Sequence, residues 1–171
     1  MAIPDKLTNF KIYDRGRDML GVVDVVLPNF QYMSESMSGA GIAGEIDSPT
    51  PGHFQSLTTT INWRTVTAEN LVLLAPVAHH FDARGNISFY DEGTGSFIDR
   101  PARAIMLGLP KSLTTGTLGV SVQTGTNIEL ELLHIMLSVN NRRLVEVDKL
   151  NFKCFINGVD YLGTQRLNLG M

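Results

Sequence analysis

The sequence has little charge and almost no cysteine, and both shortages limit what the chain can be. Charged residues make up 18% of its 171 residues, against about 25% in an ordinary soluble domain. A chain of this length buries about 70% of its unfolded surface. We therefore expect one domain over residues 1–171, with a substantial core and an outer surface that does not all face water.

The cysteine count and several other absences exclude whole classes of protein. The single cysteine, Cys154, rules out a disulfide within the chain and a cysteine-based metal cluster. The 14 basic residues are outnumbered by 17 acidic ones, whereas a nucleic-acid-binding domain needs a basic surface. The longest apolar run, Leu71–Ala78, contains Pro76 and is far shorter than the ~18 residues that span a bilayer. Residues Met1–Lys6 show no secretory signal, so we expect a soluble protein made inside the cell.

Apolar periodicity predicts mostly strands. The expected strands are Met19–Leu27, Phe30–Met37, His53–Trp63, Asn86–Tyr90, Phe97–Ile98, Ala102–Leu109, Ile128–Val139 and Leu144–Leu150. Both faces of Met19–Leu27 are apolar, which predicts a strand covered on both sides. The alternation changes phase at Leu132–Leu133, which predicts a β-bulge, and Asn140–Asn141 favours a tight turn.

One helix is expected, over Thr67–Ala75. Its apolar residues follow the spacing of one buried stripe, formed by Ala68, Leu71, Val72 and Ala75. Thr65 or Thr67 can cap its start, and Pro76 ends it. The sequence thus predicts a mainly β architecture, a barrel or a sandwich, that carries one helix.

The segment Ser38–Gly52 predicts a long loop. It holds four glycines and two prolines within about fifteen residues, and loops of that length are usually functional or flexible. Residues Gly39–Gly44 fit the pattern G-x-G-x-x-G of dinucleotide-binding sites. That mechanism needs a helix directly after the pattern, and Pro49 and Pro51 prevent one, so a flexible loop is the favoured interpretation.

No catalytic, cofactor-binding or metal-binding constellation emerges from the sequence. His79 and His80 are adjacent, so their side chains diverge. Two carboxylate pairs, Glu129 with Glu131 and Glu146 with Asp148, share strand faces and could serve acid–base catalysis. Solvent-facing strand positions explain these pairs better. Cys154 lies between phenylalanines and indicates a buried thiol rather than a nucleophile.

The C-terminal third carries the most specific signal. A strand with the motif V-E-V-D is followed by N-G-V-D and then by a final R-L-N-L-G. The motif residues are Glu146, Asp148, Asn157, Gly158, Asp160, Arg166, Asn168 and Gly170. This run resembles the ending of the major tail tube proteins of contractile-tailed bacteriophages. Three further stretches resemble the same family in order: a segment ending Leu27-Pro28, the glycines of 39–44, and the strand–helix pair Leu57–Leu74.

The chain departs from the family pattern at three places. His134-Ile135-Met136 stands where the family often has Tyr-Tyr-Lys, Asn140–Asn141 where it has Asp-Gly, and Leu107-Gly108 where it has Arg-Gly. These differences concern the placement of charge on a tube wall more than the fold.

The resemblance implies a non-enzymatic structural protein with a tail-tube-type β-barrel or sandwich. Its copies would join into six-membered rings, whose sheets merge into one wall and whose stacking in a helical assembly forms a hollow conduit for DNA ejection. The implied partners are further copies of itself and the sheath, tape measure, baseplate and tail terminator proteins, with DNA passing through unbound. Such a protein is made in the cytoplasm of the host bacterium and resides in the virion tail or in a contractile bacteriocin particle.

The resemblance also implies where subunits meet and where a bore would be. We expect the loop Ser38–Gly52 to reach a neighbouring subunit or ring and to be poorly ordered before assembly, with contacts through Gly39, Gly41, Gly44, Asp47 and Pro49. A conduit for DNA should repel phosphates. The candidate lumen acids are Asp24, Glu35, Glu129 and Glu131.

Three alternatives stay open at this point. The same subunit could form the tube of a headless bacteriocin or injection particle. A monomeric ligand-binding β-barrel is a second alternative, and a hydrolase that uses Glu129 and Glu131 is a third.

Overall fold

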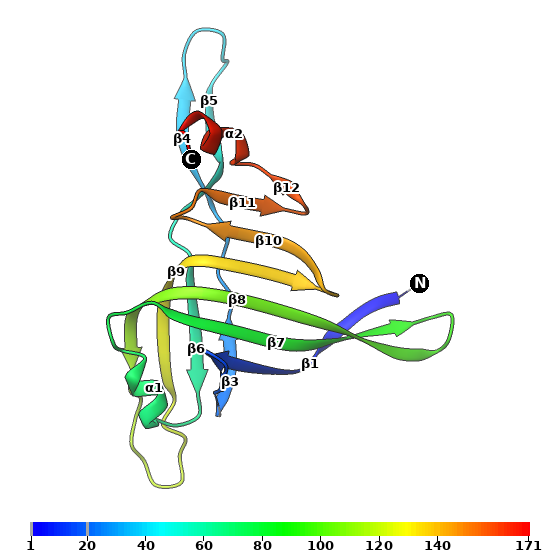
Figure 1. The fold of residues 1–171 in the computed structure, drawn as a ribbon, viewed down its shortest axis with the longest axis vertical. Coiled ribbons are helices and arrows are strands. Elements are labelled where there is room, and N and C mark those ends of the chain that lie inside the picture. The colour runs from blue at the N-terminus through cyan, green and yellow to red at the C-terminus, as the bar shows by residue number, and fades with distance from the viewer. Residues whose placement is uncertain (1, 20) are drawn as a thin grey trace.

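Long antiparallel strands dominate the fold (Figure 1). The computed structural model of the chain describes residues 2–19 and 21–171. Its elements are β1 (Ala2–Asp14), β2 (Arg17–Asp18), β3 (Val22–Val26), β4 (Tyr32–Ser38), β5 (Glu45–Phe54), β6 (Thr58–Trp63), α1 (Ala68–Val72), β7 (His79–Asp91), β8 (Ser96–Thr114), β9 (Thr126–Val139), β10 (Arg142–Asp148), β11 (Lys153–Ile156), β12 (Val159–Asp160) and α2 (Gly163–Asn168). Ten strands form one open sheet, and β4 and β5 form a separate hairpin.

The large sheet forks at β9. Residues 126–131 of β9 pair with β6, whereas residues 134–139 pair with β10. β8 runs along the other edge of β9 through both halves. We call β3, β6, residues 126–131 of β9 and residues 109–114 of β8 the four-strand sheet. The long sheet is the ladder β12-β11-β10-β9-β8-β7-β1-β2.

The fork coincides with the predicted bulge. Leu132 pairs with Gly108 and His134 pairs with Leu107, so that Leu133 is left without a partner in β8. The buried positions accordingly change from even numbers, such as Leu130 and Leu132, to an odd one, Ile135. An extra residue bends a strand and increases its twist, which lets β9 belong to both sheets.

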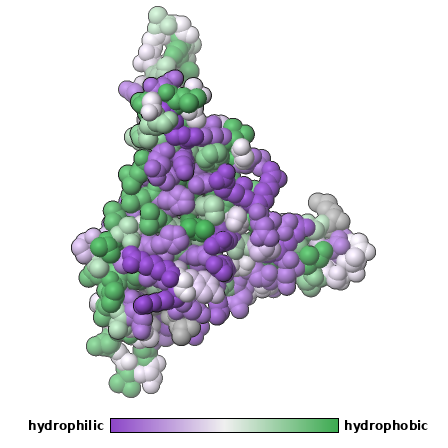
Figure 2. All heavy atoms as spheres, in the orientation of Figure 1, coloured by the Kyte–Doolittle hydropathy of each residue, from purple (hydrophilic) through white to green (hydrophobic). Residues whose placement is uncertain are grey.

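The core lies between the two sheets. The four-strand sheet contributes Ile61, Trp63, Ile128 and Leu130, and the long sheet contributes Ile12, Phe81, Met106, Ile135 and Val147. Side chains alternate between the faces of a strand, so the opposite face of each sheet is left to polar residues. Figure 2 shows hydrophilic residues over much of the face of the long sheet that looks toward the viewer.

Several predicted elements are confirmed. The expected strands Asn86–Tyr90 and Phe97–Ile98 lie in β7 and β8, which pair as a hairpin. Asn140 and Asn141 adopt φ values of 52° and 59°, as a type I′ turn between paired strands requires. Several elements were not predicted: β1, which pairs with β7 along its length, the short strands β2, β11 and β12, and a second short helix, α2.

The predicted buried stripe of the first helix is wrong. α1 covers Ala68–Val72 with Thr67 as its N-cap, but Leu71 and Val72 are 43% and 67% exposed. The buried residue of the helix is Asn70. Its side chain accepts from the Thr67 backbone N–H at 2.9 Å and donates to the Thr65 carbonyl at 3.0 Å. These hydrogen bonds turn the polar residue inward and leave the apolar stripe outside.

The expected long loop Ser38–Gly52 is also wrong in most of its length. β5 begins at Glu45 and pairs with β4, so only residues 39–44 connect the two strands. Pro49 and Pro51 hide this strand from a sequence pattern, yet a strand with an unpaired side tolerates proline. The predicted strand His53–Trp63 is interrupted at residues 55–57, between β5 and β6.

The strand expected over Met19–Leu27 is shorter and less covered than predicted. β3 spans Val22–Val26, and Leu20 lies outside the described residues. In the single subunit Val23 is 44% exposed and Val26 is 54% exposed. The prediction that other residues cover both faces of this strand is therefore wrong for the single chain.

A carboxylate with two arginines stabilises the polar face of the long sheet. Asp82 accepts hydrogen bonds from Arg103 Nε at 2.7 Å and from Arg84 Nη2 at 2.7 Å. The hydrogen bonds from Arg103 and Arg84 lower the pKa of Asp82 by more than burial raises it. The pKa falls from 3.8 to about 2. The carboxylate therefore stabilises the fold above about pH 4, and this contribution is lost as the pH falls from about 4 toward 2.

We predict that Leu130→Ala lowers the free energy of unfolding by about 2–5 kcal/mol, because Leu130 is fully buried in the core. Urea unfolding of the monomer measures this. The matched control is Leu150→Ala, at a side chain that is 65% exposed, which should change stability by no more than about 0.5 kcal/mol. Equal effects of the two variants would contradict the placement of the core.

We predict that Asp82→Asn destabilises the subunit by about 1–2 kcal/mol near neutral pH, since it removes charge-assisted hydrogen bonds whose arginines are partly exposed. The melting temperatures of variant and wild type should converge between pH 4 and pH 2. Thermal unfolding across this range measures it, with Asp99→Asn, at an exposed position, as the control. A difference that persists at pH 2 would refute the ionic origin.

Candidate functional site: open strand edges and a projecting hairpin

The subunit exposes more surface than a compact protein of its size. Its accessible surface is 10754 Å², whereas a compact monomer of 18.8 kDa exposes about 8,300 Å². The excess of about 2,400 Å² is accompanied by many exposed large hydrophobic side chains at the extremities of the molecule. Surfaces of this kind mark sites of protein association.

Both outer edges of the four-strand sheet are open. Among the described residues, β3 pairs with β6 alone, and the pairing of β8 with β7 ends at Gly108. Residues 109–114 of β8 thus pair on one side only within the part of the chain that the structure describes. Every pairing in this sheet is antiparallel, so the two edge strands of a four-strand unit run in opposite directions. Unpaired edges of this kind are templates for pairing with another chain.

The hairpin β4–β5 projects from one end of the long axis (Figure 1) and has two different faces. Met37 pairs with Ile46 on one face, where Met33 and Glu35 also lie. Met33, Met37 and Ile46 are each more than half exposed. The hairpin therefore presents an apolar face that nothing covers within the described part of the subunit.

The opposite face of the hairpin is polar. Ser36 pairs with Asp47 and Ser34 with Pro49, and Ser36 donates a hydrogen bond to Glu45. The predicted contact residues Asp47 and Pro49 thus lie on this polar face. Gly39, Gly41 and Gly44 lie in the connection at the tip, with φ values of 146°, 93° and 125°, a region that favours glycine.

The other end of the long axis carries a second apolar surface, which the sequence analysis missed. There Leu71, Val72, Leu74 and Val77 are exposed on and after α1. The connection between β8 and β9 adds Leu118, Val120 and Val122, of which Val120 is 96% exposed. Figure 2 shows hydrophobic residues at this lower end of the molecule.

Three of the four candidate lumen acids share one face. Asp24, Glu129 and Glu131 lie on the four-strand sheet at positions that alternate with buried residues, so they point away from the core. Glu35 lies on the hairpin instead.

Two of these acids have lysine partners. Lys111 Nζ lies 2.9 Å from Glu129, and Lys149 Nζ lies 2.9 Å from Glu131. Burial raises the pKa of Glu131, but hydrogen bonds from Ser56 and Lys149 outweigh it, and the pKa is lowered overall. Together the three carboxylates and the two lysines carry one net negative charge.

The C-terminal motif residues are structural. Glu146 accepts from Arg143 and faces His134 at 3.4 Å, and Asp148 accepts from the backbone N–H groups of the turn that follows β10. Asn157 and Gly158 form the next turn, with φ values of 50° and 88°. Asp160 pairs with Arg166, which lowers the pKa of Asp160.

The last two motif residues end α2. Asn168 is its final residue, and Gly170 follows with a φ of 74°. The Gly170 N–H donates to the Leu167 carbonyl and the Met171 N–H to the Arg166 carbonyl, which is the pattern of a glycine C-cap.

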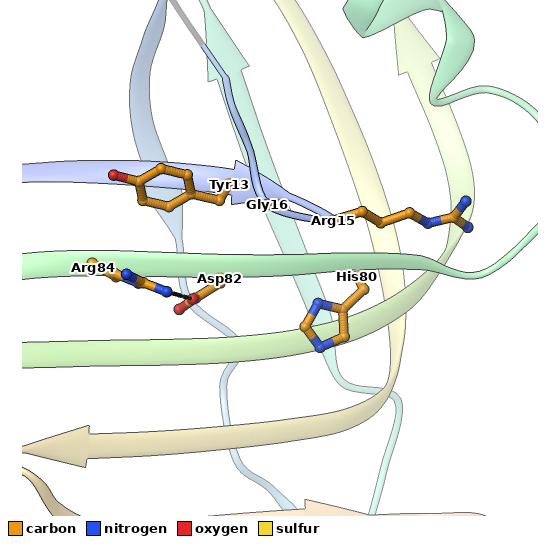
Figure 3. A pocket seen from close by; sticks show the side chains of 6 residues that line it. All are labelled: Tyr13, Arg15, Gly16, His80, Asp82 and Arg84. Atoms are coloured by element: carbon orange, nitrogen blue, oxygen red, sulfur yellow. Dashed lines mark hydrogen bonds and ion pairs between the residues drawn. The ribbon is translucent and has the colours of Figure 1, made fainter.

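An open depression of about 390 Å³ lies beside β1 and β7 (Figure 3). Its lining includes Tyr13, Arg15, His80, Asp82 and Arg84. The Asp82 carboxylate is engaged by arginines, and Figure 3 shows its ion pair with Arg84. The depression therefore presents no free acid beside a base.

Two other kinds of site are absent from the described residues. Within 2–19 and 21–171, no cluster of three or more His, Cys, Asp or Glu side chains could hold a metal ion. In the same ranges no helix has the length and apolarity needed to cross a membrane.

Comparison with known proteins finds a relative over the whole chain. The tail tube protein of Escherichia phage P2 is 26% identical over 176 residues, which cover all of both chains. A chain of the sheath/tube terminator of an extracellular contractile injection system (PVC) superposes with a TM-score of 0.56 at 13% identity, covering 79% of this chain and 96% of the other. A chain of the PVC sheath–tube complex gives 0.54 at 13% identity, with 79% and 91% covered. These two likenesses concern the fold.

The family profile described as Phage tail tube protein FII matches residues 4–170. This match covers nearly the whole chain, including the C-terminal motif and the hairpin. The protein therefore belongs to the phage tail tube protein FII family, whose members are structural proteins and not enzymes.

Proposed function

We propose that residues 1–171 act as one tube domain, six copies of which form each ring of the inner tube of a contractile tail. The observation that carries this proposal is the pair of open, oppositely directed edges of the four-strand sheet. Family membership and the sheath–tube assemblies from which the structural neighbours come support it.

The direction of the strands permits a closed ring. When copies are related by rotation about an axis along the strands, β3 of one copy meets residues 109–114 of β8 in the next. These two strands run in opposite directions, so the junction is antiparallel like every other pair in the sheet. A head-to-tail interface of this kind closes when the rotation closes, and closure removes both open edges of the four-strand sheet.

The resulting wall is wide enough for a channel. Six four-strand sheets give about 24 strands, whose spacing of about 4.8 Å sets a circumference of about 115 Å and a diameter of about 37 Å. Membrane barrels with about 16–18 strands already leave an aqueous channel. In the tube, the face of Asp24, Glu129 and Glu131 lines this channel.

The hairpin joins one ring to the next in this proposal. It projects along the long axis beyond both sheets (Figure 1), and its apolar side chains Met33, Met37 and Ile46 need a cover. The glycines at 39, 41 and 44 allow close approach of the tip to a neighbour. Since the tip makes few contacts within its own chain, it should be poorly ordered before assembly.

The long sheet then forms the outside of the tube, where a sheath would contact it. The tape measure, baseplate and tail terminator proteins would meet the tube at its bore or ends. The protein would be made in the host cytoplasm and reside in the tail, where DNA passes through the bore without specific binding.

The phage P2 relative favours a genome-delivering tail, whereas the extracellular injection system among the structural neighbours favours a headless particle.

We predict that cysteines placed across the proposed junction, one in β3 and one in residues 109–114, become linked between subunits. Non-reducing gels of the assembled protein should show a ladder that ends at six subunits, and negative-stain micrographs should show rings or hollow tubes. Cys154 is fully buried and need not be removed. The control pairs the β3 cysteine with one at Leu7, on β1, and should give no ladder. A strictly monodisperse monomer at high concentration would overturn the proposal.

We predict that the bore does not hold DNA because its charge is acidic. The double variant Asp24→Lys/Asn127→Lys places cations on the proposed bore face, and its tubes should retain DNA that a nuclease cannot reach. Wild-type tubes should retain none, and neither should the control Glu92→Lys/Asp99→Lys, at exposed positions around the β7–β8 turn. Nuclease-resistant DNA in wild-type tubes would show that the bore is not repulsive.

A further inference from the structure

The C-terminal segment lies against the base of the β4–β5 hairpin. Gly52 in β5 has a φ of 80°, and a Cβ atom there would lie 2.6 Å from Leu162 Cδ2. One residue further on, His53 Nε2 lies 3.2 Å from the side-chain oxygen of Gln165 in α2. Two residues near the C-terminus thus contact the hairpin where it leaves the rest of the subunit.

The C-terminal segment is itself fixed to the long sheet. Asp160 accepts from the Leu162 backbone N–H at 3.1 Å and from the Arg166 guanidinium. Arg166 also donates to the Phe152 carbonyl at 2.7 Å, just before β11. Leu162 is 3% exposed. The motif residues Asp160 and Arg166 therefore hold Leu162 and Gln165 in place.

The other strand of the hairpin is anchored at the same level. Tyr32 in β4 stacks on Phe54 with ring centroids 4.7 Å apart, and Phe30 meets the edge of Phe54 at 5.6 Å. Burial raises the pKa of Tyr32, and Cys154 and Tyr161 raise it further.

Among the described residues, the hairpin beyond this base pairs only with itself. β4 and β5 form a two-stranded sheet of their own, and every described residue of β4 is exposed. An arm of seven residues is about 23 Å long, so a swing of about 15° at its base moves its tip by about 6 Å. The contacts at Gly52 and His53 therefore control where the tip lies.

We propose that Leu162 and Gln165 are positioning residues for assembly: they brace the base of the hairpin so that its tip points at the next ring. This inference rests on the proposed role of the hairpin as the contact between rings. It also assigns a role to the C-terminal motif, since the Asp160–Arg166 ion pair holds Leu162 and Gln165 in place. When the brace is lost, the subunit stays folded but only a fraction of its hairpins point correctly, and the apparent affinity between rings falls by that fraction.

The first test removes the brace and measures assembly against folding. Gln165→Ala should raise the protein concentration at which tubes sediment by about five-fold, the factor that one hydrogen bond supplies, and Leu162→Ala should raise it more. Far-ultraviolet circular dichroism and melting of Gln165→Ala should match the wild type. If Gln165→Ala and Leu162→Ala both assemble as the wild type does, the brace has no role. If the wild type itself forms no rings or tubes, the proposed function fails instead.

The second test fills the contact. Gly52→Ala should displace Leu162 and weaken assembly. The control Gly16→Ala adds the same methyl group at nearly the same φ, 83°, where no other atom lies within 4 Å. It should weaken assembly no more than its loss of folding stability explains. The double variant Gly52→Ala/Leu162→Ala should assemble better than Gly52→Ala alone, because the space is restored. Equal defects in Gly52→Ala and Gly16→Ala would mean that backbone strain, and not the contact, is responsible.

The third measurement reports the direction of the hairpin. One spin label is attached at Ala40→Cys on the tip and another at Asn141→Cys on the β9–β10 turn. The distribution of distances between the two labels is measured in the unassembled subunit. The distribution should broaden when Gln165→Ala or Leu162→Ala is added. An unchanged distribution in both would overturn the brace even if assembly were impaired.

Discussion

Backbone hydrogen bonds left unmade at strand edges are the constraint on which the rest of this structure depends. Each unpaired strand offers a row of N–H and C=O groups that must be bound by water or by another strand. A single chain with this topology cannot satisfy them, because the four-strand sheet ends in β3 on one side and in residues 109–114 of β8 on the other. The bulge at Leu133 creates this situation, since it turns β9 from one sheet into the next.

The proposed assembly would also account for the low charge of the sequence. A subunit with neighbours at its sides and above and below keeps little surface in water, so it has little use for charge. Several of the exposed apolar residues form two groups. They gather on the hairpin at one end and on α1 and the β8–β9 connection at the other, which are the places where stacked copies would meet. In a monomeric protein the same residues would promote aggregation.

The parts of the fold that local chemistry determines could be predicted from the sequence. The alternation of apolar and polar residues along Ile128–Val139 predicted the strand and its bulge. The pair Asn140–Asn141 predicted the turn that follows it. The helix also exists, but its buried face was misassigned because Asn70 is satisfied by local hydrogen bonds. The missed strand β5 has prolines that a buried strand would not accept. Residues of β3 that look doubly buried in sequence are exposed in one chain, because alternating apolar residues do not reveal whether a second layer covers each face.

The candidate site was predictable only as far as the family pattern reached. The resemblance at the C-terminus identified residues whose contacts the structure explains, such as Asp160 with Arg166. It did not indicate that Leu162 and Gln165 lie against the hairpin, because no spacing pattern links positions more than one hundred residues apart. Periodicity likewise placed Asp24 and Glu129 on strand faces, but only the register put them on the same face.

The central claim is that the two open edges pair with each other between subunits, and amide hydrogen exchange tests it most directly. In the unassembled subunit, amides on the outer sides of β3 and of residues 109–114 should exchange fast, as unpaired edges do. In assembled tubes the same amides should become protected to the level of β6 and β9, the inner strands of the four-strand sheet. If tubes form while both edges continue to exchange fast, the sheets do not merge and the account is wrong.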